Sequence, residues 1–263
     1  MKTITLLLMS ALLLVGTTTA LATDIPDGAI ITERIWNDCP TSVITSVNNY
    51  ATMVSIHEQK QFCGAGWGSR HNWRFAQGGV AQNFANGDGF RFCADLTISG
   101  TGSGEAGLNL SPWWSQAVDG VFMCNANTGE ISCWGGRLPF YSFTVEHGLT
   151  YTLGVTVHME ITYLPNMLSS TNPGTVEYTL VMGGTPYSSG QLAFDEGNPA
   201  EDPPYGVWGI LNDAQAGGYF LHTLQEGDPD GFVLVEWADI CFEDLGTVAN
   251  EDATWGQVKT LYR

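Results

Sequence analysis

Positively charged residues are scarce in this sequence. Lys and Arg together number 9, against 27 Asp and Glu, so the formal net charge is −18. We therefore expect no nucleic-acid binding, because contacts to phosphates need clustered Lys and Arg. The acidic balance also disfavours anionic membrane surfaces. An acidic surface is common among soluble secreted proteins, where it supports solubility.

Long apolar runs are confined to the N-terminus. A lysine at position 2 is followed by an apolar run over residues 4–15, and an A-x-A pattern ends at residue 22. This order predicts a signal peptide over residues 1–22. The run is shorter than the roughly 20 residues of a membrane-spanning helix. We therefore expect a secreted or extracellular protein with no membrane span after residue 22, with the periplasm and the cell surface as further destinations.

Charged residues make up only 14% of the chain, whereas Gly numbers 32. Long helices prefer Ala, Glu, Lys and Leu, so this composition favours short strands joined by tight turns. Apolar residues alternate strictly over 155–163, 90–98 and 233–237, which is the pattern of half-buried strands. Two residues beyond the last of these segments, Asp239 is expected to lie on the same strand face as Trp237. Shorter strands are expected at 30–36, 52–57, 120–124, 130–134, 141–145, 176–182, 191–194, 207–211 and 219–222.

About a dozen short strands at this spacing predict an all-β fold, a two-sheet antiparallel sandwich or jelly roll. We expect one β-sandwich domain over residues 23–243. Residues 244–263 are predicted to be a C-terminal tail with a short amphipathic helix, which Asn250 can cap. Its apolar stripe consists of Trp255, Val258 and Leu261.

Six cysteines follow the predicted signal peptide, and an even number in an exported chain indicates disulfides. Six cysteines allow 15 pairings, and the sequence alone does not choose among them. One pair has a local argument, because Cys124 and Cys133 flank a turn signal at 127–130. A two-residue loop at Thr128-Gly129 would place the two cysteines opposite each other, close enough to bridge. The six are Cys39, Cys63, Cys93, Cys124, Cys133 and Cys241.

A series of short motifs resembles the concanavalin-A-like lectin and glucanase sandwich, which includes laminin-G-like domains. The resemblance covers about residues 86–243 and is one of pattern, ending in the segment Val-Glu-Trp-Ala-Asp-Ile at 235–240. In such domains a Y-x-x-G turn precedes a long central strand, as 151–154 precedes 155–163 here. The other motifs are Asp-Gly-Val-Phe at 119–122, Gly-Glu-Ile at 129–131, Phe-Tyr-Ser-Phe at 140–143 and Glu-Tyr-Thr-Leu at 177–180.

The resemblance implies that the final strand pairs with the first strand of the pattern. That would bring residues 88–98 beside 231–242 and make a Cys93–Cys241 bridge plausible. Cys39 and Cys63 would then form the remaining pair. A likeness of fold does not fix function, so the site has to be argued from its own residues.

Catalytic carboxylates of the glucanase type are not found. Those enzymes carry an E-x-D-x-x-E motif, and retaining cleavage needs two carboxyl groups about 5–5.5 Å apart. Glu236, Asp239 and Glu243 are the nearest match. By strand parity the first two face opposite sides unless a bulge intervenes, and the last two lie roughly 13 Å apart. We therefore predict no catalytic residue.

No cofactor is predicted, and no metal site has the spacing of a known motif. Oxygen-rich loops can hold calcium. Asp228 and Asp230 are the residues we would favour for calcium, although Asp, Pro and Gly also serve ordinary turns.

Aromatic and basic residues supply the clearest sign of a ligand. The pair Trp113-Trp114 lies outside the strand patterns, so one indole can face outward and stack on a sugar ring. Residues 70–74 read Arg-His-Asn-Trp-Arg, in which His71, Trp73 and Arg74 are candidate ligand-binding residues. The alternative is that the arginines pair with carboxylates and the tryptophans are structural. Four further tryptophans fall in strand patterns and are predicted to be core, namely Trp36, Trp134, Trp208 and Trp237.

Three functions remain as hypotheses. The first is a secreted, non-catalytic carbohydrate-binding or adhesion-type protein, whose partner is an extracellular glycan or surface component. The second is a glycoside hydrolase or polysaccharide lyase of the same fold. The third is a structural cell-surface protein that assembles through its C-terminal tail. The sequence does not indicate an oligomeric state.

Overall fold

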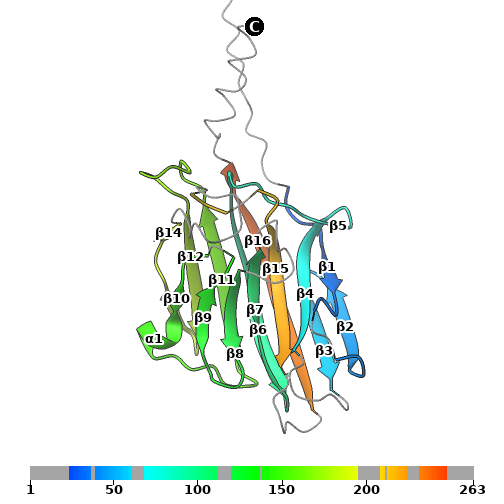
Figure 1. Cartoon of the computed structure of the whole chain (residues 1–263). Coiled ribbons are helices and arrows are strands. Elements are labelled where there is room, and N and C mark those ends of the chain that lie inside the picture. The colour runs from blue at the N-terminus through cyan, green and yellow to red at the C-terminus, as the bar shows by residue number, and fades with distance from the viewer. Residues whose placement is uncertain are drawn as a thin grey trace, which may run out of the picture.

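The computed structural model describes residues 24–36, 39–60, 68–111, 120–136, 138–194, 208–210, 212–223 and 231–247. Within these ranges the chain forms two antiparallel sheets that lie face to face (Figure 1). The predicted two-sheet sandwich is therefore confirmed. The predicted signal peptide and the predicted C-terminal helix lie outside the described residues.

The first sheet, called sheet A, runs in the order β1-β4-β15-β7-β8-β9-β10, with β5 paired to β4. Its strands are Gly28–Thr32 (β1), Gly68–Gln77 (β4), Val80–Ala81 (β5), Ser103–Ser111 (β7), Val121–Asn125 (β8), Ile131–Trp134 (β9), Tyr141–Ser142 (β10) and Gln215–Thr223 (β15).

The second sheet, called sheet B, runs in the order β13-β12-β11-β6-β16-β3-β2, with β14 paired to β12. Its strands are Val43–Asn49 (β2), Met53–Gln59 (β3), Asp88–Gly100 (β6), Thr156–Leu164 (β11), Thr175–Met182 (β12), Thr185–Ser188 (β13), Leu192–Ala193 (β14) and Phe232–Thr247 (β16).

The core lies between the two sheets and is built from the strands whose sequences alternate. On β6 and β11 the apolar members of the alternation are buried, and these two strands are neighbours in sheet B. Sheet A contributes alternate residues of β7 and β8 to the same core, such as Leu108 and Phe122. Trp237 of sheet B meets Trp73 of sheet A edge to face, with ring centroids 6.3 Å apart.

One bridge of the predicted disulfides is confirmed. Cys93 and Cys241 are bonded across the neighbouring strands β6 and β16. A disulfide of this kind fits an oxidising compartment. Cys39 is also disulfide-bonded, whereas Cys63, its predicted partner, lies outside the described residues. Nowhere in the described part of the chain is a helix long and apolar enough to cross a membrane.

The predicted Cys124–Cys133 bridge is wrong, since both thiols are free and buried. The hairpin loop has four residues rather than two, because the Asn125 side chain accepts hydrogen bonds from the backbone N–H groups of Asn127 and Thr128. Cys124 therefore lies opposite Ile131 and not opposite Cys133. The two thiols occupy diagonal positions on the core face, which are farther apart than directly opposed residues.

A β-bulge changes the expected facing of β16. The register with β6 shifts between Ala238 and Cys241, and Asp239 adopts a positive φ of 47°. Asp239 is consequently exposed and Ile240 is buried, the reverse of the strand-parity prediction. The bulge places Asp239 on the outer side of sheet B, which is also the side of Glu236.

Two smaller predictions are also corrected. Residues 141–145 were expected to form one strand, but β10 ends at Ser142 and a short helix, α1 (Phe143–His147), follows. The Ser142 hydroxyl accepts a hydrogen bond from the Val145 N–H and so caps that helix. Of the tryptophans predicted to be core, Trp237 is fully buried, but Trp36 and Trp134 are 42% and 44% exposed.

Candidate functional site

Strand β4 carries the basic and aromatic cluster that the sequence singles out. All residues of β4 except its last are buried, on both faces of the strand. His71 and Trp73 point between the sheets, where Trp73 joins the main core. Neither side chain can contact a ligand on the outer face, so the predicted ligand contacts of these two residues are corrected. Arg74 lies on the outer face of sheet A together with Arg70 and Asn72.

The outer face of sheet A carries a layer of buried polar side chains, which we call the polar layer. It spans β4, β15, β7 and β8. The exposed fraction is 4% or less for Arg70, Asn72, Arg74, Asn109, Ser111 and Tyr219, while Glu105 and Asn125 are partly exposed. Several members, among them both arginines, also have interactions beyond those given below.

One part of the polar layer is centred on Arg74. Its guanidinium donates to the backbone oxygens of Trp73 and Gly218, at 3.0 and 3.3 Å, and to the Ser111 hydroxyl at 3.3 Å. The Ser111 hydroxyl donates in turn to the Asn109 side-chain oxygen. Burial, together with the like charge of Arg70, lowers the pKa of Arg74 well below its usual range. A negative charge near Arg74 would therefore favour the charged guanidinium.

The other part of the polar layer is centred on Tyr219 of β15. The Arg70 guanidinium lies 4.2 Å from the centre of the Tyr219 ring, a cation–π contact. The Tyr219 hydroxyl donates to Glu105 at 3.4 Å. Burial raises the pKa of Tyr219, and the neighbouring Glu105 raises it further. Burial also raises the pKa of Glu105 and outweighs the opposing charge of Arg70.

Trp134 lies on the same outer face at the far side of the sheet. The strand registers place it in one row with Val121, Asn109, Gly217 and Arg74, which crosses five strands. At about 4.8 Å per strand that row is about 19 Å long. Gly217 contributes no side chain to it, and Trp134 presents an exposed indole at its end.

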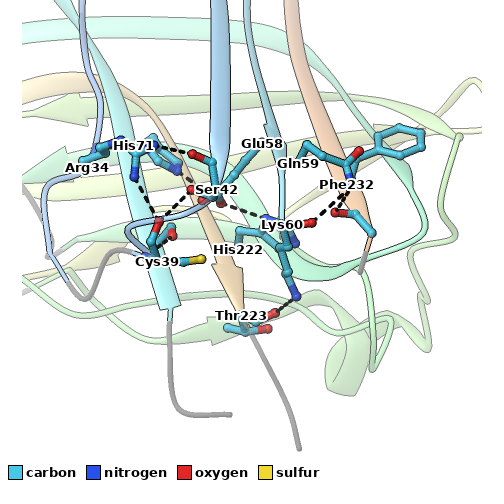
Figure 2. Close-up of polar contacts among 12 residues, drawn as sticks. Arg34, Cys39, Ser42, Glu58, Gln59, Lys60, His71, His222, Thr223 and Phe232 are labelled. Carbon is cyan, nitrogen blue, oxygen red and sulfur yellow. Dashed lines mark hydrogen bonds and ion pairs between the residues drawn. The ribbon is translucent and has the colours of Figure 1, made fainter. Parts of the chain in front are cut away.

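A second polar cluster lies inside the sandwich, directly behind β4 (Figure 2). Oε2 of Glu58, on β3 of sheet B, is 2.8 Å from Nδ1 of His222 and 3.4 Å from Nε2 of His71. Glu58 and both histidines are 1% exposed or less. We call these three residues the Glu58 network. It joins sheet B to two neighbouring strands of sheet A, β4 and β15.

The hydrogen bonds of the Glu58 network define its proton positions. The backbone N–H of Arg34 donates to Nδ1 of His71 at 3.1 Å, so the ring proton of His71 is on Nε2 and points to Glu58. His222 donates its Nδ1 proton to the same carboxylate oxygen. Within the described residues, Oε1 of Glu58 and Nε2 of His222 have no hydrogen-bond partner.

The outer face of sheet B differs from that of sheet A, because its charged groups are solvated. Arg91 pairs there with Glu160 and Glu243, and Asp95 pairs with His158 at 2.7 Å. The side chains of that His–Asp pair are about one third exposed. Exposed ion pairs of this kind are ordinary surface features of small energetic weight. The buried polar layer therefore distinguishes sheet A as the candidate site.

Other predicted site residues cannot be placed. Trp113, Trp114 and the calcium candidates Asp228 and Asp230 lie outside the described residues. Within the residues that the structure describes, no group of three or more His, Cys, Asp or Glu side chains could hold a metal ion.

Sequence reasoning did not identify Tyr219, Glu105, Asn109 and Ser111 as site residues. A signal was available for the last three, because β7 reads Glu-Ala-Gly-Leu-Asn-Leu-Ser from 105 to 111 and alternates strictly. Alternation alone would have placed Glu105, Asn109 and Ser111 on one face. It would not have shown that the outer face lacks solvent.

No protein-family model matches the sequence, and no curated protein matches it either. Some solved structures resemble the chain in part. Alginate lyase A1-II′, a member of polysaccharide lyase family 7, matches with a TM-score of 0.44 and 10% identity over 74% of this chain and 81% of the lyase.

Two lectins are similar in the same way. Lectin UEA-II, solved with galactose, has a TM-score of 0.40 at 9% identity, over 83% of this chain and 100% of the lectin. The Lotus tetragonolobus seed lectin has a TM-score of 0.38 at 8% identity, over 85% and 96%. At these scores and identities the likeness carries no argument about function and does not separate a lyase from a lectin. The strand pairing itself shows that the chain is a β-sandwich of two antiparallel sheets.

Proposed function

We propose that this protein is a secreted carbohydrate-binding protein and that its ligand lies against the outer face of sheet A. The observation that carries the proposal is the polar layer. Guanidinium, amide, hydroxyl and carboxyl groups from four strands share one face, and these are the groups that bind sugar hydroxyls and sugar carboxylates. Of the named members, Glu105 and Asn125 are partly exposed, so a ligand reaches the buried ones only when this face opens. The exposed indole of Trp134 adds a flat apolar surface at the end of the same face.

An acidic polysaccharide is the first ligand class to test. Arg70 and Arg74 are two of only nine Lys and Arg residues in a chain of net charge −18, and both lie on this face. A carboxylate can accept paired hydrogen bonds from a guanidinium. A sugar carboxylate near Arg74 would also oppose the burial and like-charge effects that lower the pKa of that residue.

Replacing Trp134 by alanine is expected to weaken binding of the glycan about tenfold or more, since aromatic side chains dominate many binding surfaces. Binding would be measured by affinity electrophoresis through sodium alginate and through neutral galactomannan. Trp36→Ala is the matched control, because Trp36 is equally exposed but belongs neither to the polar layer nor to the row of Trp134. Equal losses in the two variants, or no retention of the wild-type protein by any glycan tested, would contradict the proposal.

The arrangement around Tyr219 favours polysaccharide lyase activity as a second candidate. Elimination from an acidic polysaccharide needs three groups: one that neutralises the sugar carboxylate, a proton donor for the leaving oxygen, and a base that takes the proton from the carbon next to the carboxylate. Arg70 suits the first task. The raised pKa of Tyr219 keeps its hydroxyl protonated and suits the second. The Glu105 carboxylate, 3.4 Å from the Tyr219 hydroxyl, can serve as that base.

Tyr219→Phe is expected to abolish any release of unsaturated sugars from alginate, detected by the ultraviolet absorbance of the new C=C bond. The control is Tyr187→Phe, on the edge strand β13 of the other sheet. Product formation by the wild type that survives in Tyr219→Phe would eliminate this role for Tyr219. Binding without any product in the wild type would leave the binding protein as the function.

A further inference from the structure

The Glu58 network lies directly beneath the part of the polar layer that contains Arg70, Asn72 and Tyr219. On β4, His71 is inserted between Arg70 and Asn72, so one backbone segment presents the network inward and the polar layer outward. The register of β4 and β15 places Asn72 opposite Tyr219. A shift of this segment would therefore move these outer side chains together.

Further contacts from sheet B hold the same end of β15. Nζ of Lys60, which is 2% exposed, donates to the backbone oxygen of Thr223 at 2.6 Å. Thr223 is the last residue of β15 and follows His222 directly. Sheet B thus holds β4 and β15 through polar groups rather than through apolar packing alone.

We infer that Glu58 is a positioning residue for the outer face of sheet A, and that acid releases this positioning. The part of this inference that concerns binding rests on the proposed function. The part that concerns strand positioning does not, because it can be measured without a ligand.

The charged and titratable groups that face Glu58 all bear on this pH dependence. His71 and His222 donate to the carboxylate, and Lys60 lies next to His222. Arg34 approaches from the other side, where its guanidinium donates to the backbone oxygens of Cys39 and Ser42 at 3.1 and 2.6 Å.

The electrostatics of the network predict a loss of stability in acid. Burial lowers the pKa of His222 and outweighs the opposite effect of Glu58. Burial raises the pKa of Glu58, but hydrogen bonds from His222 and His71 outweigh it, so the net pKa lies well below its usual range. For both groups the unfolded or opened chain binds protons first as the pH falls. The contribution of His222 is therefore lost below about pH 6.5, and that of Glu58 below about pH 4.3.

The surroundings of His222 also disfavour the charged form of its ring. Its free Nε2 atom packs against the backbone at Gly102, where an added Cβ would lie only 2.6 Å away. Nε2 has no hydrogen-bond partner in the described part of the chain. A proton added there would have no acceptor, which disfavours the charged ring.

Hydrogen exchange followed by mass spectrometry tests the positioning on the protein without ligand. Exchange would be measured from about pH 7.5 to about pH 5 and corrected for the intrinsic rate, in peptides that cover β4, β15 and β11. One linked proton changes an opening equilibrium by up to about tenfold per pH unit. We expect about tenfold faster exchange in β4 and β15 at the acid end, with no such change in β11.

Glu58→Gln removes the carboxylate at nearly constant volume. In this variant β4 and β15 are expected to exchange faster already at neutral pH, with a flatter pH profile. Asp95→Asn is the matched control, because it removes the partner of His158 on the outer face of sheet B. It should leave the exchange of β4 and β15 as in the wild type.

The inference is overturned if β4 and β15 keep their protection in acid to the same extent as β11, or if Asp95→Asn reproduces Glu58→Gln. Should Glu58→Gln fail to fold, the wild-type titration decides on its own. Retention on sodium alginate supplies the binding arm, and we expect it to fall with pH in parallel with the protection of β4 and β15. Absence of retention at every pH contradicts the proposed function, while the exchange result still decides the positioning role.

Discussion

Replacing Trp237 by alanine is expected to lower the free energy of unfolding by about 3–5 kcal/mol, the usual cost of truncating a buried aromatic side chain. Trp237 is fully buried on β16 and packs edge to face on Trp73 of the opposite sheet. Its indole Nε1 donates to the backbone oxygen of Gly107 at 3.0 Å. The substitution would thus open a cavity and also remove a hydrogen bond between the two sheets.

Urea unfolding of the Trp237→Ala variant measures this effect, with Trp36→Ala as the control. Because Trp36 is 42% exposed, its truncation should cost much less, in the range of ordinary surface substitutions. Similar losses for the two variants would contradict the position of Trp237 at the centre of the sandwich.

Removal of the Cys93–Cys241 disulfide is the second large effect. A double Cys93→Ala, Cys241→Ala variant is expected to lose about 2–5 kcal/mol of stability, because the bridge closes a long loop in the unfolded chain. The two cysteines are 148 residues apart in sequence. They also join β6 and β16, which pair over most of their length at the centre of sheet B.

The double variant is preferable to a reducing agent, since Cys39 is also disulfide-bonded and would be reduced as well. Its unfolding midpoint would be compared with that of the untreated wild type. Cys124→Ser is the control, because it replaces a buried cysteine that forms no disulfide. An unchanged midpoint in the double variant would show that the bridge does not stabilise the fold.

The strands that the sequence predicts well are those with one buried face and one solvated face. On β6 and β11 the inward residues are apolar and the outward ones are polar, for example Asp95 and His158. The alternation of apolar and polar residues along the sequence therefore shows which face of each strand is buried. These two strands and β16, together with the shorter strand patterns between turn signals, predict a two-sheet sandwich.

Strand β4 could not be recognised in this way, because both of its faces are buried. Its inward residues include a histidine, and its outward residues are arginine and asparagine at positions where a core strand would have apolar side chains. Polarity therefore does not distinguish the two faces. The burial of polar side chains on its outer face prevents recognition of β4 from the sequence and also makes it part of the candidate site.

Local backbone chemistry explains the remaining errors. The Asn125 side chain sets a four-residue loop, which moved Cys133 away from Cys124. A bulge after Ala238 reversed the facing of Asp239. A shift of one or two residues in register is decided by such single contacts, which composition and periodicity do not report.

The most direct test of the central claim is a map of glycan binding on the protein. Sodium alginate oligosaccharides would be titrated into isotopically labelled protein, and the change in each backbone amide and indole signal recorded by NMR. We expect the changes to concentrate on β4, β15 and β7 and to include the Trp134 indole. Changes that concentrate instead on the outer face of sheet B, around Asp95 and His158, would contradict that claim.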